Sequence, residues 1–266
     1  LLAGQEAALR AVRPAFPALD QMAAAAAAAL RAEGKVAYAG AGSAGLMALA
    51  DGLELSGTFG IPPARTPVLF AGGSDALLHM TGAVEDDPAL AVQDFAGAGI
   101  GTGDLVICVS ASGSTPYTLE IARLARNAGA TVAGIANVAD APLLGLSDIC
   151  VFLDTGPELV SGSTRLGAGT AQKVALNLFS VLMGIRLGHV HDGYMVNVIA
   201  DNSKLRQRAA GIVSALSGAD LPAARKALDA TGGAVKPAVL VARGRAPAEA
   251  ANDLQESLGH LAPYLD

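Results

Sequence analysis

The feature that most limits the fold of this chain is a short apolar run that stops in a cluster of hydroxyl residues. Leu105–Val109 reads Leu-Val-Ile-Cys-Val, which predicts a buried strand. The next residues are Ser110-Ala-Ser-Gly-Ser-Thr115, and Pro116 opens a helical pattern that runs to Ala128. Proline suits the first turn of a helix, because the N–H that it lacks has no helical partner there. The stretch therefore predicts a strand, a small-residue loop and a helix in succession.

A loop of this kind can bind an anion. Backbone N–H groups at the start of a helix point toward the ligand, and the helix dipole favours negative charge there. The loop adds hydroxyl donors around Gly113 and carries no charge of its own; the hydroxyls are those of Ser110, Ser112, Ser114 and Thr115. The expected ligand is a phosphate group carried by a small molecule. An ordinary strand-to-helix turn uses the same residue types, so the loop alone leaves both interpretations open.

Further apolar runs alternate with helical patterns at near-regular spacing. They lie at residues 36–39, 67–70, 131–136 and 149–153. This alternation predicts an α/β fold with a doubly wound, mostly parallel sheet sandwiched by helices. Ligands of such folds bind at the carboxyl ends of the strands, where the serine-rich loop is expected.

The character of the chain changes near residue 200. We predict that residues 1–200 form the α/β domain and residues 201–266 a small all-helical domain. A short repeat supports a helical tail with glycine breaks: Leu228-x4-Gly233-x3-Pro237 recurs as Leu254-x4-Gly259-x3-Pro263. The match is short enough to arise by chance.

A second glycine loop, Gly40-Ala-Gly-Ser-Ala-Gly45, follows the first predicted strand and contains Ser43. Its GxGxxG spacing is also the dinucleotide fingerprint, which requires an acidic residue at the end of the next strand, about 20 residues further on. Pro67–Phe70 instead ends in Ala-Gly-Gly. The sequence therefore argues against a nicotinamide cofactor.

A third polar loop runs from Gly156 to Lys173 and precedes a long apolar helical pattern. It contains Glu158, Ser163 and Arg165. Arg165 can pair with a carboxylate or a phosphate. A surface arginine in a helix-capping loop fits the same sequence equally well.

Composition excludes several classes of protein. The net charge is −6 and no Lys/Arg cluster occurs, which argues against a nucleic-acid partner. No apolar run approaches the roughly 18–20 residues of a membrane span. Four scattered histidines without CxxC or HExxH spacing indicate no metal site. Cys108 and Cys150 both lie in strand patterns and are expected to be reduced core residues of a cytosolic protein. The chain begins at a leucine, which suggests that a preceding segment is missing.

Taken together, these loops resemble the sugar isomerase (SIS) domain of phosphosugar-binding proteins, and more closely the N-acetylmuramic acid 6-phosphate etherase family. The resemblance covers nearly the whole chain. It rests on Gly40-Ala-Gly-Ser, Glu54-x3-Thr-Phe-Gly60, Ala71-Gly-Gly, Glu85-Asp-Asp87, Ala111-Ser-Gly-Ser-Thr-Pro-Tyr117, Glu158-x-Val-Ser-Gly-Ser-Thr-Arg165, Ala168-Gly-Thr-Ala-Gln-Lys173 and Asn202-x-Lys-Leu-x-x-Arg208.

The resemblance implies a carbon–oxygen lyase of amino sugar metabolism and peptidoglycan recycling. Such an enzyme splits the D-lactyl ether of N-acetylmuramic acid 6-phosphate by elimination and then hydration, without metal or nucleotide. The two glutamates of the family align with Glu54, assigned as the acid toward lactate, and Glu85, assigned as the base at C2. Ser43, the Ser110–Thr115 loop, Glu158, Ser163 and Arg165 are the expected substrate and phosphate contacts. The resemblance also implies a homodimer in the cytoplasm.

The chain departs from the pattern of the family at four positions. Ala44 replaces a hydroxyl residue, Leu46 an arginine, Gly82 a glutamate and Gly167 a lysine. These losses leave open which sugar is bound, and they keep a non-catalytic sugar-phosphate regulator as an alternative. An aldose–ketose phosphosugar isomerase is a second alternative, although no motif places His79, His189 or His191 for ring opening.

Overall fold

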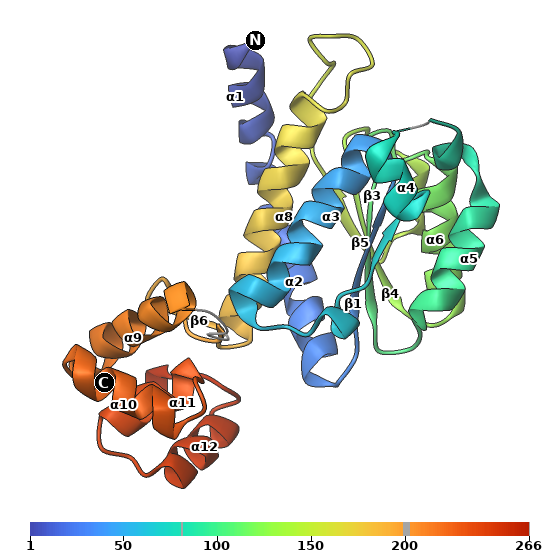
Figure 1. The fold of residues 1–266 in the computed structure, drawn as a ribbon. Helices are drawn as coiled ribbons and strands as arrows, with labels where there is room; N and C mark the ends of the chain where they lie inside the picture. Colours follow the sequence, from blue (N-terminus) through green and yellow to red (C-terminus); the bar gives the residue numbers. More distant parts are fainter. Residues whose placement is uncertain (81, 199–202, 266) are drawn as a thin grey trace. The chain divides into compact units, whose positions relative to one another are not determined.

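The computed structural model describes residues 1–80, 82–198 and 203–265. The chain divides into two compact units (Figure 1). One comprises Leu1–Glu54 and Pro62–Met183, and the other comprises Leu55–Ile61 and Gly184–Asp266. Asn202, which belongs to a motif quoted above, and the predicted domain boundary at residues 200 and 201 lie outside the described residues. The assignment of the two segments as separate functional domains stays a prediction.

The first unit is built on a five-stranded sheet in which all neighbouring strands are parallel. The strand order is β2-β1-β3-β4-β5. The strands are β1 (Val36–Gly40), β2 (Val68–Phe70), β3 (Leu105–Val109), β4 (Thr131–Ala136) and β5 (Ile149–Phe152). Every residue of β1 and β3 is buried, as expected for parallel strands that are covered on both faces.

Helices cover both faces of this sheet, which confirms the predicted fold class (Figure 1). The ring of Tyr38 in β1 contacts Phe179 of α8, and Gly52 of α3 lies against the same tyrosine. On the other face, Cys108 packs with Tyr117 and Ile121 of α6. The helices of this unit are α1 (Leu2–Arg10), α2 (Phe16–Arg31), α3 (Gly42–Phe59), α4 (Gly73–Leu78), α5 (Pro88–Ala98), α6 (Pro116–Asn127), α7 (Pro142–Leu146) and α8 (Gly167–Arg186), the last residues of α3 and α8 belonging to the second unit.

The strand order creates a switch point between β1 and β3. The chain leaves β1 toward β2 on one side and continues from β3 toward β4 on the other. In this topology the crevice at the carboxyl ends of the two switch-point strands is the usual ligand site. Gly40 at the end of β1 pairs with Val109 at the end of β3. The glycine loop and the serine loop therefore leave the sheet side by side.

The predicted burial of the two cysteines is correct for one of them. Cys108 is fully buried in β3. Cys150 is exposed in β5, which is an edge strand of the sheet. Its thiol donates to the carbonyl oxygen of Leu144 at 3.2 Å.

The second unit has its own apolar core, formed around Ala209, Val213, Ala224 and Val239. It contains a two-stranded antiparallel sheet that the sequence did not predict, made of β6 (Val190–His191) and β7 (Tyr194–Met195). Its helices are α9 (Ser203–Ser217), α10 (Leu221–Ala230), α11 (Val235–Ala242) and α12 (Pro247–Glu256).

The short sequence repeat near the end of the chain corresponds to two helices that end in the same way. Gly233 and Gly259 have φ values of +85° and +84°. Their N–H groups donate to the carbonyl oxygens of Leu228 at 2.8 Å and Leu254 at 2.7 Å, five residues earlier. This bond is typical of the Schellman motif, in which the residue before the donor is left-handed and closes the helix, as Gly232 and Leu258 do here. The repeat is therefore structural and marks the ends of α10 and α12.

We expect Gly233→Ala to lower the free energy of unfolding of the second unit by about 1 kcal/mol, because alanine disfavours a positive φ. The matched control is Gly211→Ala in the middle of α9, where an added Cβ meets no atom within 4 Å. That change should raise stability by roughly 0.5–1 kcal/mol, since glycine is a poor helix former. Urea unfolding followed by circular dichroism measures both, and equal effects of the two changes would contradict the assignment.

Candidate active site

The serine loop at the end of β3 is held by its own hydroxyl groups. The Ser110 side chain is buried, and its Oγ accepts the Gly113 N–H at 3.0 Å and lies 2.9 Å from the Thr115 Oγ1. The Ser112 Oγ accepts both the N–H and the hydroxyl of Ser114, at 3.2 and 3.0 Å. The hydroxyls that the sequence predicted as phosphate contacts are thus brought together in one ordered loop.

Gly113 is required by the shape of this loop. Its φ is +64°, and a Cβ at this position would lie 2.4 Å from the Cβ of Ala141. Its carbonyl oxygen accepts the N–H of Leu143 at 2.9 Å, which ties the loop to α7. A larger residue would push the loop away from α7 and spread its hydroxyls.

The loop leads into a helix start whose side-chain cap is missing. Thr115 is the N-cap residue of α6, but its side chain makes no capping bond to the helix because its hydroxyl meets Ser110 instead. Pro116 fills the first position and contributes no N–H. The first turn of α6 therefore presents backbone N–H groups and the positive end of the helix dipole to an anion.

Glu85 lies at the neighbouring loop, against the start of α3. A Cβ on Gly42 would lie 2.4 Å from the Oε1 atom of Glu85, so the carboxyl group occupies the space that the missing side chain leaves. Gly42 and Glu85 line a small cavity of about 150 Å³ with Ala71, Val84 and Gly82.

The surroundings of Glu85 favour its neutral form. Burial is the main cause that raises its pKa above the ordinary glutamate value, and the neighbouring charge of Asp86 adds to the effect. A carboxyl group with a raised pKa exchanges a proton more readily near neutral pH, which is what a general acid or base requires. Ser43 follows Gly42 in the first turn of α3 and is half-buried.

Glu54 does not reach this cavity within one chain. It is exposed on α3, twelve residues after Gly42. An α-helix rises 1.5 Å per residue, so Glu54 lies about 18 Å along the helix from the point that Glu85 touches. The two carboxyl groups were predicted to serve one substrate, and a single chain does not bring them together.

Glu54 instead stands above a buried polar cluster that the sequence analysis missed. Asp51, one helical turn earlier, is only 3% exposed. Its two carboxyl oxygens accept the hydroxyl of Tyr38 at 2.9 Å and that of Ser180 at 3.0 Å. Burial is the main cause that raises the pKa of Asp51 to about 6; the charge of Glu54 adds to the rise, and both hydrogen bonds and the charge of Lys173 oppose it. Asp51 thus interacts electrostatically with both Glu54 and Lys173.

The third polar loop, residues 156–173, holds the start of α8. The carboxylate of Glu158 accepts the N–H groups of Gly167 and Ala168, both at 2.9 Å, and so caps α8. Ser163 donates its backbone N–H to Val160, and Arg165 is exposed. Within the described ranges no hydrogen bond or ion pair joins this loop to Ser110–Thr115. The structure therefore does not place these three residues with the serine loop.

A pair of polar side chains that was not predicted from the sequence, Gln172 and Asn137, stabilises the serine loop through hydrogen bonds. Gln172 is 1% exposed and donates its amide to the Asn137 side chain at 2.9 Å. Asn137 in turn donates its own amide to the Leu153 carbonyl at 3.1 Å, and its backbone N–H to the carbonyl of Ala111. An asparagine directly after a buried strand was the signal available in the sequence. These bonds connect α8 and the ends of β4 and β5 to the loop.

Two features are absent from the described part of the chain. No three His, Cys, Asp or Glu side chains gather there in the manner of metal ligands. None of the helices in that part combines the length and apolar character that a membrane crossing requires.

Comparison with known proteins gives consistent matches. The SIS domain family matches residues 5–137. The chain is 45% identical over 257 residues to an N-acetylmuramic acid 6-phosphate etherase of Deinococcus radiodurans, covering 96% of this chain and 84% of the relative. It is 43% identical over 229 residues to one of Streptomyces avermitilis, covering 86% and 74%. A phosphoheptose isomerase structure from Francisella tularensis has a TM-score of 0.53 at 19% identity, over 68% of this chain and 94% of that one. At that identity it shows the fold alone.

The pKa of Asp51 is higher in the folded chain than its ordinary value of 3.8. Its contribution to the free energy of unfolding is therefore fully present below pH 3.8 and is lost as the pH rises through about 6. We therefore expect the free energy of unfolding of the wild type, relative to Asp51→Asn, to fall by about 2 kcal/mol between pH ~4 and ~7. Urea unfolding at several pH values measures this. The exposed Asp154→Asn change is the control, and the same pH-dependent difference for both variants would refute the interpretation.

Proposed function

Since the chain belongs to the N-acetylmuramic acid 6-phosphate etherase family, we propose that it splits N-acetylmuramic acid 6-phosphate into N-acetylglucosamine 6-phosphate and D-lactate. This membership confirms the resemblance seen in the sequence, and the enzyme is a carbon–oxygen lyase. The observation that carries the proposal is the carboxyl group of Glu85 held against Gly42, beside a hydroxyl-lined loop at a helix start.

The reaction requires one group to accept a proton and one to donate a proton. In the open-chain sugar the C1 aldehyde acidifies the C2 hydrogen, so a base at C2 takes that proton. The electron pair forms a C2–C3 double bond, the C3–O bond breaks, and an acid protonates the departing lactate oxygen. Water then adds at C3 to restore the hydroxyl. We assign Glu85 as the base and Glu54 as the acid. The different surroundings of the two carboxyl groups are what allow them to take different roles.

The serine loop positions the substrate. Its hydroxyls and the N–H groups at the start of α6 suit the 6-phosphate of the sugar. Because Gly40 pairs with Val109, a sugar anchored on this loop extends toward the start of α3 and Glu85. The loop contributes orientation, which lowers the entropic part of the barrier.

Because Glu54 and Glu85 lie far apart in one chain, we propose a homodimer in which each active site takes residues from both protomers. Glu54 is exposed on α3, and apolar side chains are exposed near it on the same helix and on α8: Leu53 (66%), Leu178 (37%) and Val181 (45%). A second copy that covers this surface would bury the apolar groups. It would also bring Glu54 of one protomer toward the Glu85 cavity of its partner.

We place the enzyme in the cytoplasm, because its substrate is a charged sugar phosphate. Two free thiols, one of them exposed, also suit a reducing compartment.

We expect Glu54→Gln and Glu85→Gln each to reduce the release of lactate from N-acetylmuramic acid 6-phosphate by at least about 100-fold, because each removes one proton-transfer group. Lactate is measured enzymatically. Glu120→Gln on α6 is the control and should leave turnover unchanged.

Unchanged lactate release in both variants would remove the etherase assignment of these residues. Binding of the sugar phosphate without any turnover by the wild type would favour the non-catalytic regulator. Interconversion of the sugar without lactate release would favour the isomerase.

The shared site has its own test. If Glu54 acts on the partner, a mixed dimer of Glu54→Gln and Glu85→Gln protomers contains one intact site and one doubly altered site. Unfolding the two inactive variants together and refolding them should restore about a quarter of the wild-type activity, through random pairing in a two-fold dimer. Each variant refolded alone is the control. No recovery from the mixture would place both glutamates of a site on one chain or would show that the dimer does not form.

A further inference from the structure

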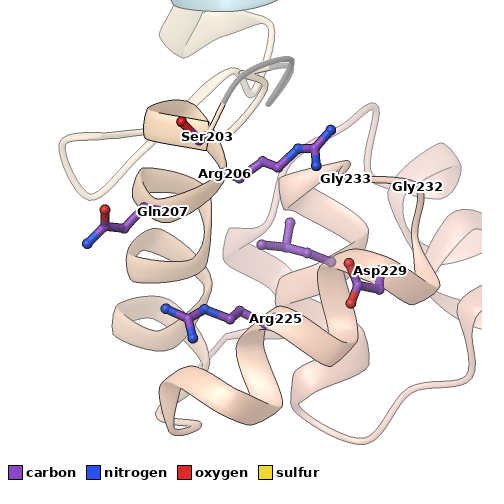
Figure 2. A pocket seen from close by; sticks show the side chains of 8 residues that line it. Ser203, Arg206, Gln207, Arg225, Asp229, Gly232 and Gly233 are labelled. Atoms are coloured by element: carbon purple, nitrogen blue, oxygen red, sulfur yellow. The ribbon is translucent and has the colours of Figure 1, made fainter.

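The second unit contains a groove that the reaction does not use. It has a volume of about 750 Å³, within the range of pockets that hold small molecules. It lies between α9, α10 and the turn at Gly232 and Gly233 (Figure 2). Its lining residues in the described part of the chain belong to the second unit: Ser203, Arg206, Gln207, Arg225, Leu228, Asp229, Gly232 and Gly233.

Two arginines enter the groove from different helices. Figure 2 shows Arg206 extending from α9 toward the turn at Gly232 and Gly233, and Arg225 extending from α10 toward α9. Neither guanidinium forms an ion pair with any carboxylate of the described residues, although Asp229 lines the same groove. Guanidinium groups in a groove without a paired acid favour an anionic ligand.

The surrounding segment is basic, although the whole chain carries a net charge of −6. Residues 203–230 contain five basic side chains and two acidic ones. Lys204 and Arg206 stand in the first turn of α9, which contains no acidic residue. Positive side chains at a helix N-terminus oppose the helix dipole, and a bound anion would relieve this repulsion. The local charge therefore also favours an anion.

We propose that this groove binds a phosphorylated sugar. Arginine forks match phosphate oxygens in a bidentate manner. Asp229 and Gln207 can hydrogen-bond sugar hydroxyls, and buried Leu228 together with the glycine turn offers an apolar surface for the ring. A bare phosphate ion would leave most of the volume unfilled. This inference rests on the groove alone and does not depend on the proposed etherase activity.

The test is isothermal titration of the full chain with N-acetylglucosamine 6-phosphate at low ionic strength. The wild type should show two classes of site. Arg206→Gln/Arg225→Gln should weaken one class by about tenfold for each guanidinium removed and leave the other unchanged. Ser112→Ala/Ser114→Ala in the serine loop should weaken the other class alone. Lys226→Gln/Arg243→Gln, which removes equal charge outside the groove lining, should change neither class.

Three other outcomes would count against the proposal, and one would count against the etherase site alone. Binding unchanged in Arg206→Gln/Arg225→Gln would overturn it, as would an equal loss in the control pair, which would show a general charge effect. Inorganic phosphate binding as tightly as the sugar phosphate would reduce the groove to a simple anion site. If only the serine-loop variant behaves as the wild type, the etherase site fails while the groove stands, so the two proposals are separated. Equal melting temperatures of all variants establish that they are folded.

Discussion

The close contact between the end of β1 and the start of α3 is the constraint on which the rest of the site depends. A Cβ on Gly45 would lie 2.8 Å from the carbonyl group of Gly40, so only glycine lets the helix begin directly over the strand. The tight turn also leaves the space above Gly42 that the carboxyl group of Glu85 occupies. β1 pairs with β2 on one side and with β3 on the other. The same turn therefore brings Glu85 and the serine loop together at the carboxyl ends of these strands.

This contact explains why the glycine pattern could be read in two ways. The GxGxxG spacing of Gly40–Gly45 is shared by dinucleotide sites and by any helix that packs closely on the preceding strand. The missing acid after β2 was sufficient to argue against the nucleotide. The strands themselves were predictable because buried parallel strands are continuous apolar runs. Cys150 broke this rule because a run of apolar residues does not reveal which strand lies at the edge of the sheet.

The polar contacts were less predictable, since their partners are distant in sequence. Asp51 meets Ser180 across 129 residues, and Asn137 meets Gln172 across 35. A single polar residue in an apolar helix is usually interpreted as facing solvent, and only the packing of α3 against α8 shows that Asp51 is buried. Glu158 shows that the role of a polar loop residue is also hard to predict. Its position in a polar loop predicts a pocket residue, which stays a prediction, and the structure adds that its carboxylate satisfies the free N–H groups at the start of α8.

The positions of the two glutamates along α3 also bear on how the proposed dimer would work. A helix keeps residues 42 and 54 about 18 Å apart, so no side-chain rotation within one chain can join Glu54 to Glu85. A two-fold axis removes this limit, because each protomer then gives Glu54 to its partner and receives the same group in return. The two sites of such a dimer form together or not at all, and activity would follow the fraction of paired protomers as the protein is diluted. The sequence could indicate both carboxyl groups, but only the distance between them along α3 leads to the proposal of a second copy.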